Sequence, residues 1–187
     1  MQDYLALIGS FVIGGLMLIA FLDFDADLKN HSFEHTTDLI VQQNAAAMID
    51  LVEWDFRKIG YGLDFPALAI YDSNFISYYV DLGGDGVIDT VRYFVSDSSA
   101  ASMTTNPRDR IFYRLSNQDP NIDAAMGVTD FHLQYYDISG NPTTNLLQIK
   151  TIEVSLTIES TEPYNGEYRR FFWREKITPP NLLPYDS

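Results

Sequence analysis

In the segment MQDYLALIGSFVIGGLMLIAFLDFDADLK (residues 1–29), residues 4–22 carry no charged side chain. A helix needs about 20 apolar residues to cross the hydrocarbon layer of a membrane, and this run has nearly that length. A secretory signal peptide would instead begin with basic residues and have an apolar centre of about 7–15 residues. The run therefore predicts either a membrane anchor or a rod that packs against other helices.

The helical pattern continues beyond the apolar run, because residues 25–59 contain neither proline nor glycine. Gly60 and Gly62 then mark its C-terminal end. We expect one helix made of a hydrophobic segment (1–24) and an amphipathic continuation (25–60). Apolar residues in the continuation recur at spacings of three and four, which places them on one face of a helix. This stripe consists of Val41, Ala45, Met48, Val52, Phe56 and Ile59.

After residue 60 the apolar period changes from that of a helix to the period of two that is typical of strands. In IKTIEVSLTIES (149–160), apolar and polar side chains alternate, which predicts a strand buried on one face. We expect strands near residues 76–80, 90–95, 111–115, 128–136, 149–159 and 167–177. The predicted fold is α+β, with a long N-terminal spine helix and an antiparallel β-sheet head (61–187) packed on the helix's C-terminal half. The junction between helix and head is predicted to bury Val52, Phe56 and Ile59.

Composition excludes several functions. The chain of 187 residues has 12 Lys and Arg against 26 Asp and Glu, a formal net charge of −14, which repels nucleic acids. It has no cysteine, so disulfides, Cys-ligated zinc, iron–sulfur clusters and thiol nucleophiles are impossible. Neither a G-x-S-x-G nucleophile motif nor a phosphate-binding G-K-[ST] motif is present. We therefore expect a protein that is not an enzyme and has no nucleic acid partner.

The segment HSFEH (31–35) matches the H-x-x-E-H pattern of inverted zinc peptidases. A catalytic zinc site would also need a third ligand and a cleft. The only other histidine is His132, and the motif lies on a helix shortly after the apolar run. We interpret His31 and His35 as residues on a solvated or subunit-facing helix surface.

The segment DLGGDGVID (81–89) has the spacing of an oxygen-lined calcium loop. The ligand positions 1, 3, 5, 7 and 9 correspond to Asp81, Gly83, Asp85, Val87 and Asp89, with Gly86 at the turn. Position 12 is Arg92, where an EF-hand has a bidentate glutamate. Two interpretations follow: a structural calcium site, or a β-hairpin whose acidic tip is an ordinary turn.

In its order of elements the chain resembles the type IV pilins and the pseudopilins of type II secretion. The segments LVEWDFRKIGYG (51–62), GVTDFHLQYYDISGNP (127–142) and ITPPNL (177–182) are similar to those of W-type minor pilins and J-type pseudopilins. The family usually has a leader that ends in glycine and a glutamate at the fifth mature position, where this sequence has Leu5. Met1 is then either the methylated first residue of a mature subunit or the initiator.

The resemblance implies a structural subunit of a type IV pilin-like extracellular filament. Its partners would be copies of itself or related pilins and the inner-membrane assembly machinery. Its location would be the inner membrane before assembly and the cell surface afterwards. The residues themselves offer a packing stripe, because Ala6, Ser10 and Gly14 place a small residue at every fourth position of the apolar helix. Two alternatives are a low-copy minor pilin or pseudopilin that primes or caps a filament, and a monomeric membrane-anchored binding module.

Overall fold

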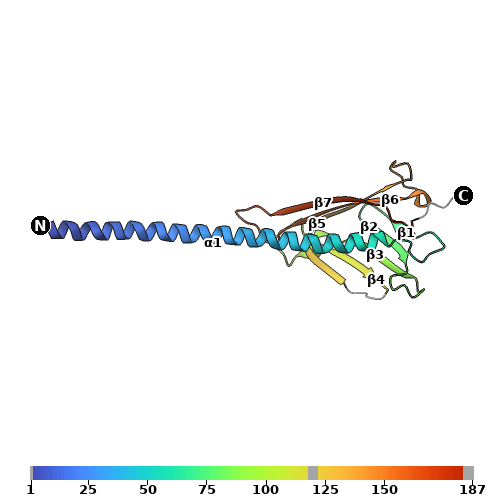
Figure 1. The fold of residues 1–187 in the computed structure, drawn as a ribbon, viewed down its shortest axis with the longest axis horizontal. Helices are drawn as coiled ribbons and strands as arrows, with labels where there is room; N and C mark the ends of the chain where they lie inside the picture. The colour runs from blue at the N-terminus through green and yellow to red at the C-terminus, as the bar shows by residue number, and fades with distance from the viewer. Residues whose placement is uncertain (1, 118–121, 183–187) are drawn as a thin grey trace. The chain divides into compact units, whose positions relative to one another are not determined.

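The computed structural model describes the backbone of residues 2–117 and 122–182, and the side chains of these residues except 2, 3, 5, 6 and 122–126. Within this part of the chain, one long helix is followed by a seven-stranded sheet in which all neighbouring strands are antiparallel (Figure 1). The predicted α+β architecture is therefore confirmed. The elements are α1 (Gln2–Arg57), β1 (Leu68–Tyr71), β2 (Phe75–Val80), β3 (Asp89–Val95), η1 (Ser98–Ala101), β4 (Arg110–Ser116), β5 (Ile122–Tyr136), η2 (Leu146–Gln148), β6 (Thr151–Glu159) and β7 (Arg170–Ile177), where η denotes a 3-10 helix.

By its internal contacts the chain divides into two units, Met1–Leu39 and Ile40–Ser187. The first unit is the N-terminal part of α1, and the second contains the rest of α1 together with the sheet. The segments predicted from the sequence (1–24, 25–60 and 61–187) are bounded where the hydropathy or the spacing of the apolar residues changes. The contact-based boundary differs because the last turns of α1 pack on the sheet and so belong to its unit.

Helix α1 ends at Arg57, and its last turns are closed by tighter hydrogen bonds. The amide of Lys58 donates to the carbonyl of Asp55 at 3.1 Å, and the amide of Ile59 to that of Phe56 at 3.2 Å. Gly60 follows with a φ of +81°, a conformation that favours glycine. A Cβ atom on Gly60 would lie 2.5 Å from the carbonyl oxygen of Asn181, so the close approach of the C-terminal segment also requires glycine.

The strands lie in the sheet in the order of the sequence, from β1 at one edge to β7 at the other. Strand β5 changes register against both of its neighbours close to Gly127, whose φ is +71°. A Cβ atom at this position would collide with the carbonyl oxygen of Glu159 on β6. Gly127 therefore lets β5 bend between β4 and β6 while the backbones stay close.

The structure confirms the six predicted strands as β2 to β7, with bounds shifted by up to three residues except in β5, which begins at Ile122, six residues earlier than predicted. It adds strand β1, which sequence analysis missed. Strand β1 has only four residues, follows Pro66 closely and pairs with β2 in an irregular register. Such a short edge strand has too few residues to show an alternating pattern.

The core of the second unit lies between α1 and one face of the sheet. The predicted stripe on α1 is buried along its whole length, from Val41 to Ile59. On β6, four alternating apolar residues from Ile152 to Ile158 face this core, as the alternation predicts. Helix and sheet thus bury each other's apolar faces, which is the reason for the α+β arrangement.

Candidate functional site

The apolar surface of α1 before residue 25 is the first candidate site, because the large apolar side chains that the structure describes there are exposed. Phe11 is 74% exposed and Leu16 is 62% exposed, and the other large apolar side chains described between residues 4 and 24 are similarly exposed. Within the described residues, one helix is long and apolar enough to cross a membrane, and none of its most apolar window is buried. This surface requires lipid or other protein around it.

Two of the three predicted packing residues can be placed on this surface. The hydroxyl of Ser10 donates to the carbonyl of Leu7 at 2.7 Å, so it is satisfied within the helix. A Cβ atom built on Gly14 would have no atom within 4 Å, which leaves the backbone there open to a neighbour. Ala6 lies outside the residues whose side chains the structure describes.

The histidines of HSFEH lie on the same helix and are exposed. Nδ1 of His31 lies 3.9 Å from Oε2 of Glu34, whereas His132 is on β5 in the second unit. No group of three His, Asp or Glu side chains that could hold a metal ion occurs among the described residues. The arrangement of HSFEH gives no support to zinc peptidase chemistry.

The junction between α1 and the sheet buries the three residues predicted there. Val52, Phe56 and Ile59 are all fully buried. The ring of Phe56 packs edge-on against Tyr78 and Tyr93, with centroids 6.0 Å and 5.5 Å apart. These contacts fix the last turn of α1 against β2 and β3.

A buried ion pair beside Phe56, not found by sequence analysis, joins the same turn of α1 to β4. The carboxylate of Asp55 is completely buried and accepts from Arg114 at 2.6 Å (Nε) and 3.2 Å (Nη2). It also accepts from the hydroxyl of Tyr93 at 2.6 Å. The signal for this pair is Asp55 itself, a carboxylate three residues after Val52 at the edge of the apolar stripe.

The surroundings of this pair change the acidity of the groups around it. Burial raises the pKa of the Tyr93 hydroxyl well above its usual value, and the negative charge of Asp55 acts in the same direction. Burial alone would lower the pKa of Arg114, but the hydrogen bond and charge of Asp55 outweigh it and raise the pKa. Both shifts favour the protonated forms of Tyr93 and Arg114, which are the forms that donate hydrogen bonds to Asp55.

The loop between β2 and β3 is organised by the carboxylate of Asp81. Its Oδ1 accepts from the amides of Gly84 (2.7 Å) and Asp85 (3.2 Å), and its Oδ2 from the amide of Gly86 (2.9 Å). Oδ1 of Asp85 accepts from the amide of Val87 at 2.9 Å. Oδ2 of Asp89 accepts from the amide of Leu82 at 3.3 Å.

These bonds form a hairpin tip, in agreement with the hairpin interpretation of DLGGDGVID. Asp81 and Asp89 are buried, whereas Asp85 is exposed, and the three carboxylates are not grouped as metal ligands. Gly83 and Val87 remain the predicted backbone ligands. Calcium at this loop stays a prediction.

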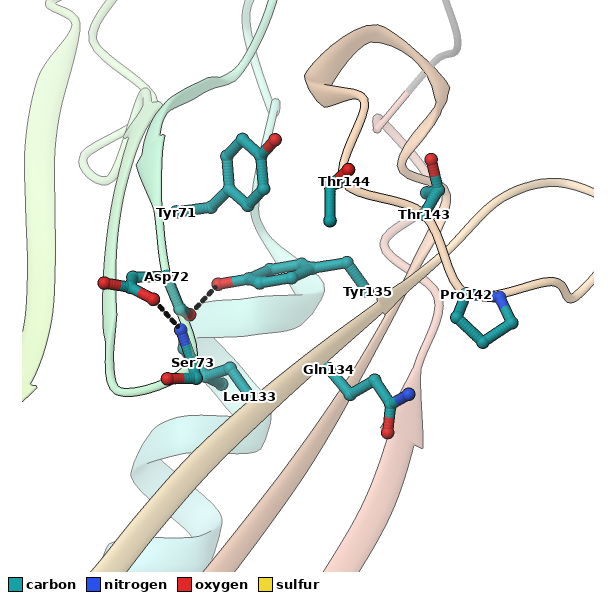
Figure 2. Close-up of a pocket in the computed structure, with 9 residues that line it drawn as sticks. All are labelled: Tyr71, Asp72, Ser73, Leu133, Gln134, Tyr135, Pro142, Thr143 and Thr144. Carbon is teal, nitrogen blue, oxygen red and sulfur yellow. Dashed lines mark hydrogen bonds between the residues drawn. The ribbon is translucent and has the colours of Figure 1, made fainter.

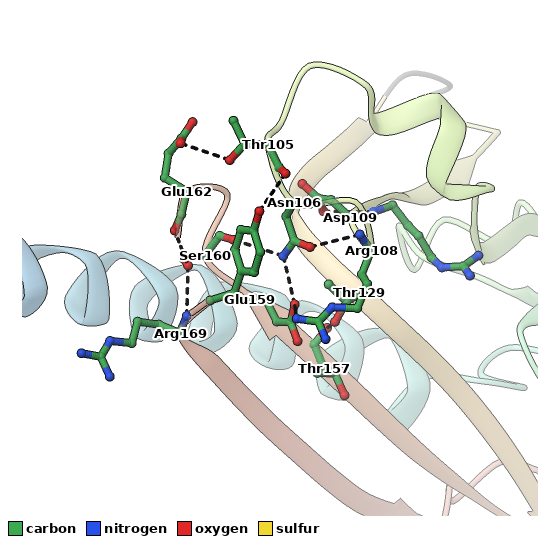
Figure 3. A network of polar contacts seen from close by, with 12 residues as sticks. Thr105, Asn106, Arg108, Asp109, Thr129, Thr157, Glu159, Ser160, Glu162 and Arg169 are labelled. Atoms are coloured by element: carbon green, nitrogen blue, oxygen red, sulfur yellow. Dashed lines mark hydrogen bonds and ion pairs between the residues drawn. The ribbon is translucent and has the colours of Figure 1, made fainter. Parts of the chain in front are cut away.

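A second polar cluster joins the segment before β4 to the ends of β6 and β7 (Figure 3). The buried carboxylate of Glu159 accepts from Asn106 Nδ2 and from Arg108 Nη2, both at 2.9 Å. The hydroxyl of Tyr168 donates to the carbonyl of Thr105 at 2.7 Å. Burial raises the pKa of the nearby Asp109 carboxyl, and the charge of Glu159 adds to this effect. The polar and charged groups of the cluster bond to one another, which is typical of a structural network.

Comparison with known proteins adds no assignment, since no family model, curated protein or solved structure matches this chain.

Proposed function

We propose that the chain is a structural subunit of a type IV pilin-like extracellular filament and assembles through the apolar part of α1. The observation that carries the proposal is the contrast within one helix. Its residues 7–24 expose an apolar surface on all sides, while its residues 41–57 form part of the core of a folded unit. A folded unit on a continuous apolar helix is what a subunit needs if the helices are to form a filament core.

The resemblance of the sequence to W-type minor pilins and J-type pseudopilins supports the same proposal. In this account the subunit is held in the inner membrane by α1 before assembly, and the assembly machinery then moves it into the filament. Its partners are other copies or related pilins. The net charge of −14 argues against nucleic acid as a further partner.

The first alternative keeps the fold but makes the chain a low-copy minor pilin or pseudopilin. Such a subunit would prime or cap a filament made of another protein. The second alternative is a monomeric binding module that uses α1 only as a membrane anchor, for which the length and composition of the apolar run are sufficient.

Electron microscopy of filaments sheared from cells, with mass spectrometry of their main component, separates these functions. The proposal expects filaments in which this chain is the main component. Filaments in which it is a trace component would favour the minor subunit, and its recovery only in membranes would favour the anchored module. The mass of the N-terminal peptide also establishes whether Met1 is the first residue and carries a methyl group.

A further inference from the structure

The second unit has a pocket that none of the features above uses. It lies between the β1–β2 turn, strand β5 and residues 142–144, and has a volume of about 400 Å³. Figure 2 shows the ring of Tyr135 in the middle of the pocket, with Tyr71, Thr143 and Thr144 along one side. Small-molecule sites in proteins usually have volumes of about 300–1,000 Å³, and this pocket lies within that range.

The walls of the pocket are fixed to one another by hydrogen bonds through β5. The hydroxyl of Tyr135 donates to the carbonyl of Asp72 at 2.9 Å, and the amide of Leu133 donates to the carbonyl of Ser73 at 2.7 Å. On the other side, the amide of Thr143 donates to the carbonyl of Tyr135 at 2.9 Å. A ligand would therefore enter a pre-formed pocket and would have to order little of the chain.

The lining of the pocket combines aromatic rings with hydroxyl groups. Tyr71 packs edge-on against Tyr135, with centroids 5.1 Å apart and an interplanar angle of 79°. The hydroxyls of Tyr71 and Thr144 form no hydrogen bond among the described residues, so both can bind a ligand. The hydroxyl of Thr143 accepts from the amide of Asn145 at 3.1 Å and keeps its own proton to donate.

The charge of the pocket selects the class of ligand. Its lining contains no Lys, Arg or His, and its single charged side chain is the carboxylate of Asp72. An anion would meet this carboxylate in a protein that already has a net charge of −14. A neutral molecule is favoured, with hydroxyls for Tyr71, Thr143 and Thr144 and an apolar face for the aromatic rings.

We propose that this pocket binds a neutral saccharide unit. The C–H face of a pyranose ring would pack against an aromatic ring, while its hydroxyls would exchange hydrogen bonds with the three side-chain hydroxyls. The proposal does not depend on whether the chain forms filaments, because every residue that carries it lies in the second unit.

The test is a glycan array that presents neutral and sialylated glycans to the labelled full-length chain in detergent. We expect retention on at least one neutral glycan. We also expect at least tenfold weaker binding when the pocket hydroxyls are removed in Tyr71→Phe/Thr144→Val, and a smaller loss in each single variant. The matched control Tyr61→Phe/Thr161→Val makes the same chemical changes on the surface outside the pocket and should bind like the parent.

Thermal unfolding of each variant establishes that it is folded before its binding is compared. The proposal is overturned if no neutral glycan retains the chain, or if only sialylated glycans do. It is also overturned if both double variants bind like the parent, or if both lose binding equally.

Discussion

Helix α1 contains two apolar regions with opposite surroundings. Phe11 is 74% exposed, whereas Phe56, in the same helix, is completely buried. The difference lies in the partner, because the sheet covers the stripe from Val41 onward, whereas the described large apolar side chains before residue 25 are exposed. An apolar stripe on one face can be covered by the chain's own sheet, whereas an apolar surface on all sides requires an environment from outside the chain.

Removing the apolar surface before residue 25 should have the largest effect, on both solubility and assembly. A chain that begins at Asp27 lacks the exposed apolar run, so it should be soluble and monomeric in analytical ultracentrifugation without detergent. The full chain should need detergent or should polymerise. Filaments of the native kind formed by the truncated chain would show that assembly does not depend on the first region.

In the second region, breaking the buried ion pair should strongly destabilise the fold. Asp55→Ala leaves the guanidinium of Arg114 buried without its partner, which should lower the free energy of unfolding by about 3–5 kcal/mol. Urea denaturation of the truncated chain measures this loss. The double variant Asp55→Leu/Arg114→Met removes both charges and should recover part of the stability, since the buried hydroxyl of Tyr93 still loses its acceptor. A single-variant loss below about 1 kcal/mol would mean that the pair does not hold α1 to β4.

Truncating the ring at the junction should have a comparable or slightly smaller effect. Phe56→Ala removes the contacts with Tyr78 and Tyr93 and should cost about 3–5 kcal/mol of unfolding free energy. Trp54→Ala, on the same turn but with a side chain 52% exposed, serves as the control. It should change stability by about 0.5 kcal/mol, as is usual for surface positions. Similar losses for the two variants would contradict the assignment of the buried face.

Calcium and substitutions at the acidic hairpin should have the smallest effect on stability. If calcium binds at Asp81, Asp85 and Asp89, the truncated chain should melt at a higher temperature in millimolar calcium than in chelator, with magnesium much less effective. Calcium at a hundredfold its dissociation constant would raise the free energy of unfolding by about 2.7 kcal/mol. Asp85→Asn should abolish most of the calcium effect and raise the metal-free melting temperature by removing one repelling charge. Identical melting curves in calcium and chelator would leave the loop as an ordinary turn.

The sequence predicts the fold well because its periodic signals are long. The stripe from Val41 to Ile59 and the alternation in β6 each repeat several times, so single residues matter little. Strand β1 is too short for such a signal. The pair of Asp55 with Arg114 and the pocket around Tyr135 join residues far apart in the sequence, and a one-dimensional pattern contains no information about those contacts.

Disulfide cross-linking shows whether the exposed part of α1 packs against other copies of the chain. Because the chain has no cysteine, each single substitution gives an unambiguous product. In membranes or filaments, Ser10→Cys should give cross-linked dimers in high yield. Val12→Cys, on another face of the helix, and Met103→Cys, at a side chain 94% exposed in the second unit, should give few. Equal yields at positions 10 and 12 would contradict helix packing through the small-residue stripe. No dimers at either position would favour a monomeric membrane anchor.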